Sequence, residues 1–515
     1  MNKNLTFFFY DYESFGVSPA LDRPAQFAGI RTDSDFNIIG DPVMFYCKQT
    51  PDYLPSPEAV MVTGITPQQC NAEGVSEPEF AARTHAEFSQ PNTCILGYNN
   101  IRYDDEMTRY TFFRNFVDPY EYSWKNGNSR WDLLDLVRAC YALRPDGIEW
   151  VTDENGVPNF KLENLTKANG IAHENAHDAM ADVYATIAMA KLIKQKQPKL
   201  FQFFFENRGK KEIKKMIDTG EMTPLVHVSG MFGNARGNTA WIAPIAWHPT
   251  NQNQVLCCDL SGYVSALLTD SAEELRTHLY TKKEELPENV APVPLKGVHI
   301  NRCPIIAPAK VLLPENAARL GIDRERCLEN LKLLKANKSL VREKVTEIFM
   351  EERSFEASAN VETTLYDGFF SPADKNNMAI LRTLQPQELE HHGLQFADER
   401  VEALLFHYRA RHYPETLSRA EQIKWQKYCH QQIDAKSAQF AESIDNLFQI
   451  HHDNPEKVKL LEDLTAYAAQ IAEFQMVKHT ANAQSDEQLV SALNQVAEQG
   501  VDKAAKLAML KALIK

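Results

Sequence analysis

Residues 7–13 read Phe7-Phe8-Phe9-Tyr10-Asp11-Tyr12-Glu13, an aromatic run that carries two carboxylates at its end. Aromatic residues are enriched in strands, so the run predicts a buried strand. In an extended strand, side chains at i and i+2 point to the same face, and Asp11 and Glu13 should therefore project together. Two carboxylates held this close repel each other unless a cation lies between them. The strand therefore predicts a metal site.

A second acidic segment lies far downstream and reads His177-Asp178-Ala179-Met180-Ala181-Asp182. The apolar spacing that follows it predicts a packed helix that stops before Pro198. Asp182 is the candidate metal ligand on this helix, and Asp178, four residues earlier, is a rival on spacing alone. His177 precedes the helix by about one turn. Its ordinary pKa of about 6.5 suits a general base, although a histidine here could also simply cap the helix.

A third acidic position follows the stretch from Gly97 to Asp104, which ends an apolar strand and opens a helix. Hydrolysis of a phosphodiester by two metal ions about 3.5–4 Å apart needs several converging carboxylates, and Asp104 is the third candidate. Magnesium prefers such hard oxygen ligands. We interpret the neighbouring acidic residues as helix N-terminal charges, caps or surface charges: Asp105, Glu106, Asp132 and Asp135.

Composition limits the class of protein. The chain has 515 residues, a formal net charge of -14 and nine cysteines without a CxxC pair. The length predicts two to four domains, and the cysteines indicate reduced thiols in the cytoplasm. No signal-peptide pattern opens the chain, and no apolar run approaches the roughly 20 residues that span a membrane. The acidic balance argues against nonspecific nucleic-acid binding unless basic residues line one groove.

The residue composition and the pattern of expected strands and helices change along the chain, and these changes predict its domain boundaries. Residues 1–198 alternate strands and helices, and residues 199–350 are rich in β-formers and end in helices. A linker opens the third region, 351–475, which is helical. Residues 476–515 are predicted as a helical tail of unknown role. Within it, residues 485–515 form their own amphipathic pattern, which predicts terminal helices that pack on the body or bind a partner or a membrane surface.

Together the three acidic motifs resemble those of the DEDDh exonucleases, which share a ribonuclease-H-like fold. The family motifs are D-x-E on a strand, N-x3-[FY]-D, and H-x4-D. In this sequence they begin at Asp11, at Asn99 or Asn100, and at His177. The sister subclass has Tyr-x3-Asp at the third motif, and Asp178 in place of that tyrosine excludes it.

The resemblance extends to the bacterial exodeoxyribonuclease I family over residues 5 to about 470. The segments that carry it, beyond the three motifs, are 14–16, 19–27, 138–145, 165–170, 226–232 and 406–411. It implies an α/β exonuclease domain with a mixed sheet flanked by helices, an SH3-like β-barrel domain and a C-terminal all-α domain, arranged as a C around single-stranded DNA. It also implies processive 3′→5′ degradation to 5′-mononucleotides in DNA repair and recombination.

The resemblance further implies the cofactor, the partners and the site residues. Two Mg²⁺ ions per active site, for which Mn²⁺ can substitute, would be held by Asp11, Glu13, Asp104 and Asp182, with His177 as the base. The partners would be single-stranded DNA and the single-stranded-DNA-binding protein, which is engaged through its acidic C-terminal tail. The enzyme would act as a monomer. Gly64 and Ile65, together with Glu13, would lie against the terminal nucleotide.

Single-strand recognition needs cations for phosphates and aromatic rings for bases. The region 120–131 interleaves both types, and half of its aromatic residues should belong to the core. The candidate DNA contacts outside the motifs are Tyr120, Trp124, Arg130, Arg144 and Lys161. The basic runs at 208–215 and 324–335 could line the DNA path, meet the acidic tail or be solvated helix faces. Leu313 stands where the family suggests a cation for that tail.

Two rival functions remain open from the sequence. A ribonuclease of the same fold would explain the active site but not the 300 or so residues that follow it. Recognition of the 2′-hydroxyl would distinguish it, and no motif here indicates such recognition. A module that only binds DNA ends is the rival of another class, and the full set of acidic motifs argues against it.

Overall fold

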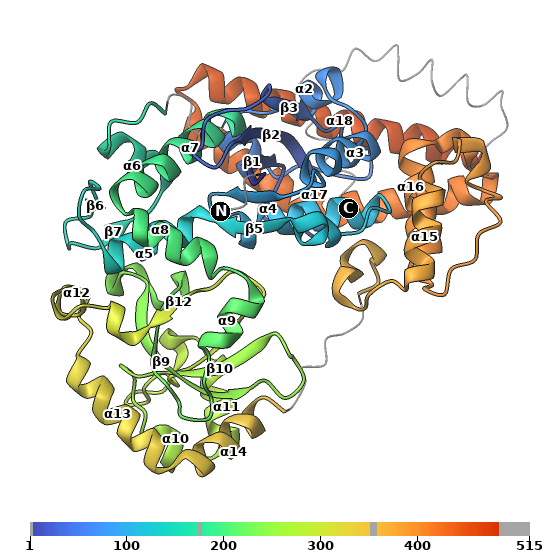
Figure 1. The fold of residues 1–515 in the computed structure, drawn as a ribbon. Helices are drawn as coiled ribbons and strands as arrows, with labels where there is room; N and C mark the ends of the chain where they lie inside the picture. Colours follow the sequence, from blue (N-terminus) through green and yellow to red (C-terminus); the bar gives the residue numbers. More distant parts are fainter. Residues whose placement is uncertain (1–3, 174–177, 351–357, 484–515) are drawn as a thin grey trace.

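The computed structural model describes residues 4–173, 178–350 and 358–483. Its three domains are arranged in a C, in which the N-terminal α/β domain lies between a β-rich domain and a helical C-terminal domain (Figure 1). None of the described helices is long and apolar enough to span a membrane. All nine cysteines lie in the described part of the chain and are free thiols, as predicted.

The N-terminal domain is built on a five-stranded mixed sheet with the order β3-β2-β1-β4-β5. Its strands are β1 (Thr6–Ser14), β2 (Pro24–Thr32), β3 (Val43–Tyr46), β4 (Thr93–Gly97) and β5 (Ser129–Asp132). The central strand β1 runs antiparallel to β2 and parallel to β4. β3 begins only at Val43, because Ile38 forms only an isolated bridge with Thr32 and Pro42 cannot donate to a ladder.

Helices cover the two faces of this sheet. They are α1 (Pro57–Thr63), α2 (Pro67–Glu73), α3 (Glu77–Phe88), α4 (Asp104–Arg114), α5 (Leu133–Leu143), α6 (Leu162–Ala168), α7 (Ala179–Lys196) and α8 (Pro198–Glu206). A small hairpin of β6 (Val151–Thr152) and β7 (Pro158–Asn159) lies between α5 and α6.

Side chains along β1 point alternately to the two faces of the sheet, and this alternation determines the face on which the acidic residues lie. Phe7 and Phe9 pack in one core cluster with α7 and α8, whereas Phe8 and Tyr10 pack in another cluster on the opposite face with α3 and α4. Asp11 follows Phe7 and Phe9 at the same two-residue period, so the α7 face is also the face on which the metal site was predicted.

The helix α8, which begins at the predicted boundary of residue 198, packs against the core of the N-terminal domain. Phe205 packs on Phe7 with ring centroids 5.3 Å apart, and Phe201 packs on Trp131, also at 5.3 Å. Since these rings complete the core under β1 and β5, the domain extends to the end of α8 at Glu206.

The second domain contains an antiparallel five-stranded sheet with the order β11-β10-β9-β8-β12. Its strands are β8 (Leu225–Val228), β9 (Thr239–Trp247), β10 (Gln254–Asp259), β11 (Leu295–His299) and β12 (Ile305–Pro308). β11 and β12 are the edge strands, so the pairing of the described strands is that of a curled sheet rather than a closed barrel. The helices around it are α9 (Lys210–Met216), α10 (Ala266–Thr269), α11 (Ala272–Tyr280), α12 (Pro314–Arg319), α13 (Arg324–Ala336) and α14 (Lys338–Ile348).

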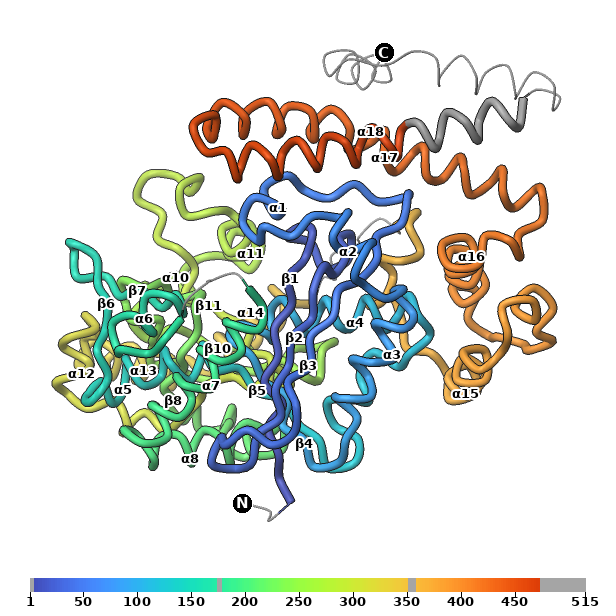
Figure 2. The backbone as a smooth tube through the Cα atoms, turned by 90° about the horizontal axis from the view of Figure 1, so that it is seen from above, coloured from blue at the N-terminus to red at the C-terminus, as the bar shows by residue number. Residues whose placement is uncertain are grey.

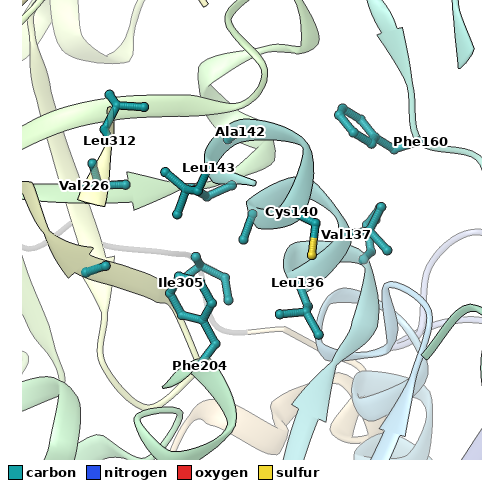
Figure 3. Packing of buried hydrophobic residues seen from close by; sticks show 14 of the residues in the cluster. Leu136, Val137, Cys140, Ala142, Leu143, Phe160, Phe204, Val226, Ile305 and Leu312 are labelled. Atoms are coloured by element: carbon teal, nitrogen blue, oxygen red, sulfur yellow. The ribbon is translucent and has the colours of Figure 1, made fainter. Parts of the chain in front are cut away.

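The first two domains share a hydrophobic core at α5. Cys140 and Leu143 of α5 meet Phe204 of α8, and strands of the second domain close the cluster with Val226 and Ile305 (Figure 3). A continuous core of this kind holds the two domains as one body.

The C-terminal domain is helical, as predicted. After the 3-10 helix η8 (Val361–Tyr366) it contains α15 (Pro372–Leu381), α16 (Arg400–His412), α17 (Arg419–His451) and α18 (Pro455–Ala483). The long helices α17 and α18 form a pair that lies across α1 and α2 (Figure 2). The predicted boundary at 475 falls inside α18. The amphipathic pattern predicted for residues 485–515 lies outside the described residues.

Candidate active site

Three carboxylates converge at the end of β1. Asp11, Glu13 and Asp182 each offer one oxygen, and these atoms all lie within 4.8 Å of one another. Glu13 is 9% exposed, and α7 brings Asp182 to the face of β1 from which Asp11 and Glu13 project. The structure thus joins the first and third acidic motifs, as the sequence predicted. Carboxylate oxygens at this spacing fit a hard divalent cation such as Mg²⁺.

Asp104 lies next to this group at the start of α4. It is 5% exposed, and its Oδ1 accepts a hydrogen bond from the backbone N–H of Tyr12 at 3.2 Å. Since Tyr12 stands between Asp11 and Glu13, this bond fixes Asp104 against the acidic end of β1. The carboxylate of Asp104 is not one of the three that lie within 4.8 Å of one another.

Burial and mutual repulsion shift the titration of these carboxylates. Burial, followed by the charges of Asp182 and Asp104, raises the pKa of Glu13 to about 9. Burial raises the pKa of Asp104 to about 8. Burial and then the charge of Asp104 raise the pKa of Asp11 well above its ordinary range. The raised pKa values show that the ionised carboxylates are unfavourable without a counter-charge. A bound cation would therefore stabilise their ionised form.

The rival ligand Asp178 has another role. It is the N-cap of α7, and its Oδ1 accepts the backbone N–H of Ala181 at 3.0 Å. The same helix end is anchored to the sheet by Gln26, which lies opposite Glu13 in the β1–β2 ladder and accepts the backbone N–H of Ala179 at 3.3 Å. Asp178 therefore starts the helix that carries Asp182.

The candidate base His177 lies outside the described residues. Another histidine, which the motifs did not indicate, contacts the site. His173 Nε2 lies 2.6 Å from Asp182 Oδ1, and its Nδ1 lies 3.1 Å from Thr166 Oγ1. Its side chain is buried, and no family motif or spacing in the sequence points to it.

A cavity of about 660 Å³ opens over the carboxylates. Besides Asp11, Asp182 and His173, it is lined by Tyr98, Asn99, Leu134, Arg138, Asp153, Val157, Pro158, Asn159, Phe160, Lys161, Leu162, Glu163 and Asn234. Of the DNA contacts predicted outside the motifs, Lys161 is the one on this wall, with an exposed side chain. Arg138 and Asn234 were not predicted. Asn234 shows that the second domain also borders the cavity.

Arg130 is not a surface cation. It is 8% exposed, it forms an ion pair with the fully buried Asp105, and it donates to the carbonyl of Asn301 at 3.0 Å. Arg130 therefore ties β5 to the second domain. Asp105 is its counter-ion and lies in the first turn of α4, as predicted, with its Oδ1 also accepting a hydrogen bond from Tyr10 at 2.5 Å. Asp132 is buried and accepts a hydrogen bond from the backbone N–H of Leu134. Of the roles predicted for Asp132, the structure therefore shows the helix cap, at the start of α5.

The other predicted contacts lie at three places. Gly64 ends α1 with a φ of +72° and has open space around it, whereas Ile65 is buried in the core under α17 and α18. Trp124 is 61% exposed. Tyr120 packs against Phe369 of the C-terminal domain at 5.4 Å.

Arg144 lines a different cavity, of about 360 Å³, between α8 and the segment 307–311. It donates to the carbonyl of Val311 at 3.1 Å. In the predicted basic runs, Arg208 stacks on Phe205 at 3.7 Å and Arg324 lies 5.2 Å from the ring of Trp241. These two arginines therefore serve packing.

Comparison with known proteins agrees with this architecture. Residues 8–190 match a family model described as Exonuclease, residues 208–351 match the Exonuclease I SH3-like domain, and residues 359–471 match the Exonuclease I C-terminal domain. The fold and the acidic site therefore define an exonuclease.

Individual known proteins and solved structures also match the chain. Exodeoxyribonuclease I of Haemophilus influenzae is 69% identical over 472 residues, which cover 92% of this chain and 100% of that protein. The crystal structure of Escherichia coli exonuclease I in complex with a dA16 oligonucleotide matches with a TM-score of 0.89 and 56% identity, covering 91% of this chain and 100% of that one. A structure of SSB/exonuclease I in complex with an inhibitor matches at 0.85 and 54%, covering 91% and 99%. The chain belongs to the exodeoxyribonuclease I family, which confirms the resemblance and the three-part fold class.

Proposed function

We propose that this protein is a magnesium-dependent 3′→5′ exonuclease that degrades single-stranded DNA to 5′-mononucleotides. The observation that carries the proposal is the convergence of Asp11, Glu13 and Asp182 in a chain of the exodeoxyribonuclease I family, with Asp11 and Asp182 lining an open cavity. The relative solved with a dA16 oligonucleotide supports the choice of substrate.

The donor set fits two Mg²⁺ ions, for which Mn²⁺ can substitute, because every side chain in it offers carboxylate oxygen. Asp11, Glu13, Asp104 and Asp182 would hold the ions. When bound, the ions supply charge neutralisation for the phosphodiester and lower the pKa of a water molecule. His177, at the family's histidine position, takes the proton from the attacking water.

The chain's other residues bind and orient the strand. Lys161 on the cavity wall meets a backbone phosphate, and the exposed ring of Trp124 offers a stacking surface for a base. Tyr120 contributes through its ring, and Gly64 and Ile65 support the terminal nucleotide. The open space around Gly64 supports a close approach of the backbone there.

The experiment that tests the function uses 5′-labelled single-stranded DNA, duplex DNA and RNA, each with magnesium or with EDTA. The expected result is a shortening ladder with single-stranded DNA and magnesium alone. Degradation of RNA instead would make the protein a ribonuclease. Binding of DNA ends without cleavage would make it an end-binding module.

The partner proposal concerns the acidic C-terminal tail of the single-stranded-DNA-binding protein. The cavity beside Arg144 suits such a tail, because Arg144 and Lys199 supply cations and Leu200, Phe203 and Val311 supply an apolar floor. Lys199→Glu should weaken binding of a fluorescent acidic tail peptide about 10-fold, or about 1.4 kcal/mol. Lys161→Glu is the control and should leave peptide binding unchanged. The opposite ranking would place the tail elsewhere.

We also propose that the enzyme acts as a cytoplasmic monomer in DNA repair and recombination. The cysteine content and the family support this setting. Sedimentation of the full chain as a single 58.6 kDa species would test the oligomeric state.

A further inference from the structure

A buried ion network joins the C-terminal domain to the loop between β1 and β2. Arg23 from that loop lies 2.7 Å from Glu362 of η8, and Arg411 of α16 lies 2.5 Å from the same carboxylate. Arg411 also binds Asp52 at 2.7 Å. All four side chains are at most 9% exposed. Two arginines and two carboxylates thus balance one another inside the domain interface.

The arginines of this network stabilise the ionised form of the Glu362 carboxylate. Burial alone would raise the pKa of Glu362, but the charges of Arg411 and Arg23 hold it well below its ordinary value. His407 adds a contact of 2.8 Å to Glu362 Oε1. Removing one partner would leave a buried uncompensated charge, so these groups fix the relative position of the two segments firmly.

The loop that the network holds continues directly from the metal ligand Glu13. The β1–β2 ladder pairs Glu13 with Gln26 and shifts its register between Glu13 and Ser14. Beyond that irregularity, the backbone N–H of Phe15 donates to the carbonyl of Arg23 at 3.0 Å. The chain that follows Glu13 is therefore held by its contact with Arg23 rather than by a regular β-ladder.

A second contact from the C-terminal domain holds the same loop. Lys436 of α17 lies 3.6 Å from Asp22, and Asp22 accepts a hydrogen bond of 2.9 Å from Tyr53. The Tyr53 hydroxyl oxygen also lies 3.0 Å from the carbonyl oxygen of Phe15, so the two acceptors share its one proton. Two elements of the C-terminal domain, η8 through Glu362 and α17 through Lys436, thus contact Arg23 and Asp22, the residues where the loop that begins after Glu13 returns to β2.

We propose that the C-terminal domain sets the position of Glu13 in the metal site, with Arg23, Glu362 and Arg411 as positioning residues. The inference rests on the metal site of the proposed function. It gives the C-terminal domain a role in metal affinity that is separate from contact with DNA, because the groups that hold a ligand's surroundings in place govern how well that ligand carboxylate is oriented.

The test measures binding of Mn²⁺ by calorimetry, without DNA, in the full chain. Glu362→Gln and Arg411→Gln should weaken Mn²⁺ binding about 10-fold. The matched control is Arg409→Gln on the same helix. Arg409 is 5% exposed and also paired, but its partners Glu390, Thr416 and Glu421 all lie in the C-terminal domain. Arg409→Gln should bind Mn²⁺ like the wild type.

The activity measurement complements the binding measurement. In Glu362→Gln, the magnesium concentration that gives half-maximal rate should rise about 10-fold, and the maximal rate should return at high magnesium. Lys436→Met removes a partly exposed contact and keeps the fold, so it should shift the half-maximal concentration in the same direction even if the network variants misfold.

The outcomes separate the two proposals. If the wild type does not bind Mn²⁺, the metal site itself is wrong. If the wild type binds Mn²⁺ and Lys436→Met together with the folded network variants bind it equally well, the positioning role is wrong and the metal site stands. An equal loss in Arg409→Gln and Arg411→Gln would also overturn the positioning role, because it would reflect general destabilisation.

Discussion

His173 Nε2 lies 2.6 Å from Asp182 Oδ1, so a buried histidine orients the carboxylate that α7 brings to the metal site. Thr166 contacts the other ring nitrogen at 3.1 Å and fixes the ring. The same Asp182 carboxylate offers an oxygen within 4.8 Å of oxygens of Asp11 and Glu13, so His173 contacts a member of the candidate metal site. This is the usual arrangement of a ligand carboxylate and its supporting group.

We predict that His173→Ala weakens Mn²⁺ binding about 10–100-fold, because Asp182 loses the group that orients it. Calorimetry without DNA measures this directly. His85→Ala is a suitable control, since His85 packs against Phe112 on α4 instead of against a ligand. Unchanged Mn²⁺ affinity in His173→Ala would show that the histidine does not support the ligand.

The N-terminus of α7 offers a matched pair of substitutions. Asp178→Asn should keep both stability and activity, because asparagine caps a helix about as well as aspartate. Asp182→Asn should lose several kcal/mol of transition-state stabilisation, or roughly 10³-fold in rate. In metal-free buffer Asp182→Asn should also melt at a higher temperature, because one member of a repelling cluster is neutralised.

Rate assays and thermal denaturation in EDTA distinguish the two aspartates. Equal loss of activity in Asp178→Asn and Asp182→Asn would mean that the cap is also a ligand. A lower melting temperature for Asp182→Asn without metal would contradict the repulsion inferred from the raised pKa of Glu13.

The proposed base gives a third prediction. His177→Ala should lower the rate about 10²–10⁴-fold, because the attacking water loses its proton acceptor. Binding of single-stranded DNA and of Mn²⁺ should both survive, and the survival of Mn²⁺ binding is what separates His177→Ala from His173→Ala. Full activity of His177→Ala would show that another group takes the proton.

Local rules in the sequence, together with the resemblance to the family, predicted the carboxylates that converge in the candidate metal site. The two-residue period of a strand brings Asp11 and Glu13 together, and helix capping explains why Asp182 rather than Asp178 faces them. The strand period depends on neighbours within a few residues, whereas spacing on the helix left Asp178 as a rival, and the resemblance to the family was needed to favour Asp182.

Arg130 and the α8 boundary could not be predicted in this way. Arg130 is interleaved with aromatic residues like a DNA contact, but a counter-ion 25 residues away, Asp105, and a carbonyl in the second domain bury it. Likewise, α8 begins at Pro198, directly after the end of α7, and its packing against the first domain through Phe205 and Phe7 becomes visible only in three dimensions. His173 belongs to no motif, so its contact with Asp182 becomes visible only in three dimensions.

The raised pKa values of the carboxylates predict how metal binding depends on pH. For Glu13 the pKa rises from 4.5 to about 9 on folding, so the folded metal-free protein binds more protons than the unfolded chain between these values. Its stability should therefore fall as pH rises through that window. Metal ions compete with these protons, so the increase in melting temperature caused by Mg²⁺ should be larger at pH 8.5 than at pH 6.

Thermal denaturation at both pH values, with Mg²⁺ and with EDTA, measures this effect. Asp182→Asn is the control, because removing a like charge should reduce the dependence on pH. A stabilisation by Mg²⁺ that is equal at the two pH values would show that the carboxylates are already ionised without metal.

Arg130 and Lys161 provide the last prediction, which separates a structural cation from a DNA contact. Arg130→Met should cost about 3–5 kcal/mol of unfolding free energy, because Asp105 is left buried without its counter-ion. Lys161→Met should leave stability unchanged, because its side chain is exposed. Instead, it should lower affinity for single-stranded DNA and reduce the slope of log K against log[salt] by about 0.7, the value for one phosphate contact on a single strand. Denaturant titration and anisotropy in EDTA measure both quantities. If Arg130→Met lowered the salt slope and kept its stability, Arg130 would be the phosphate contact after all.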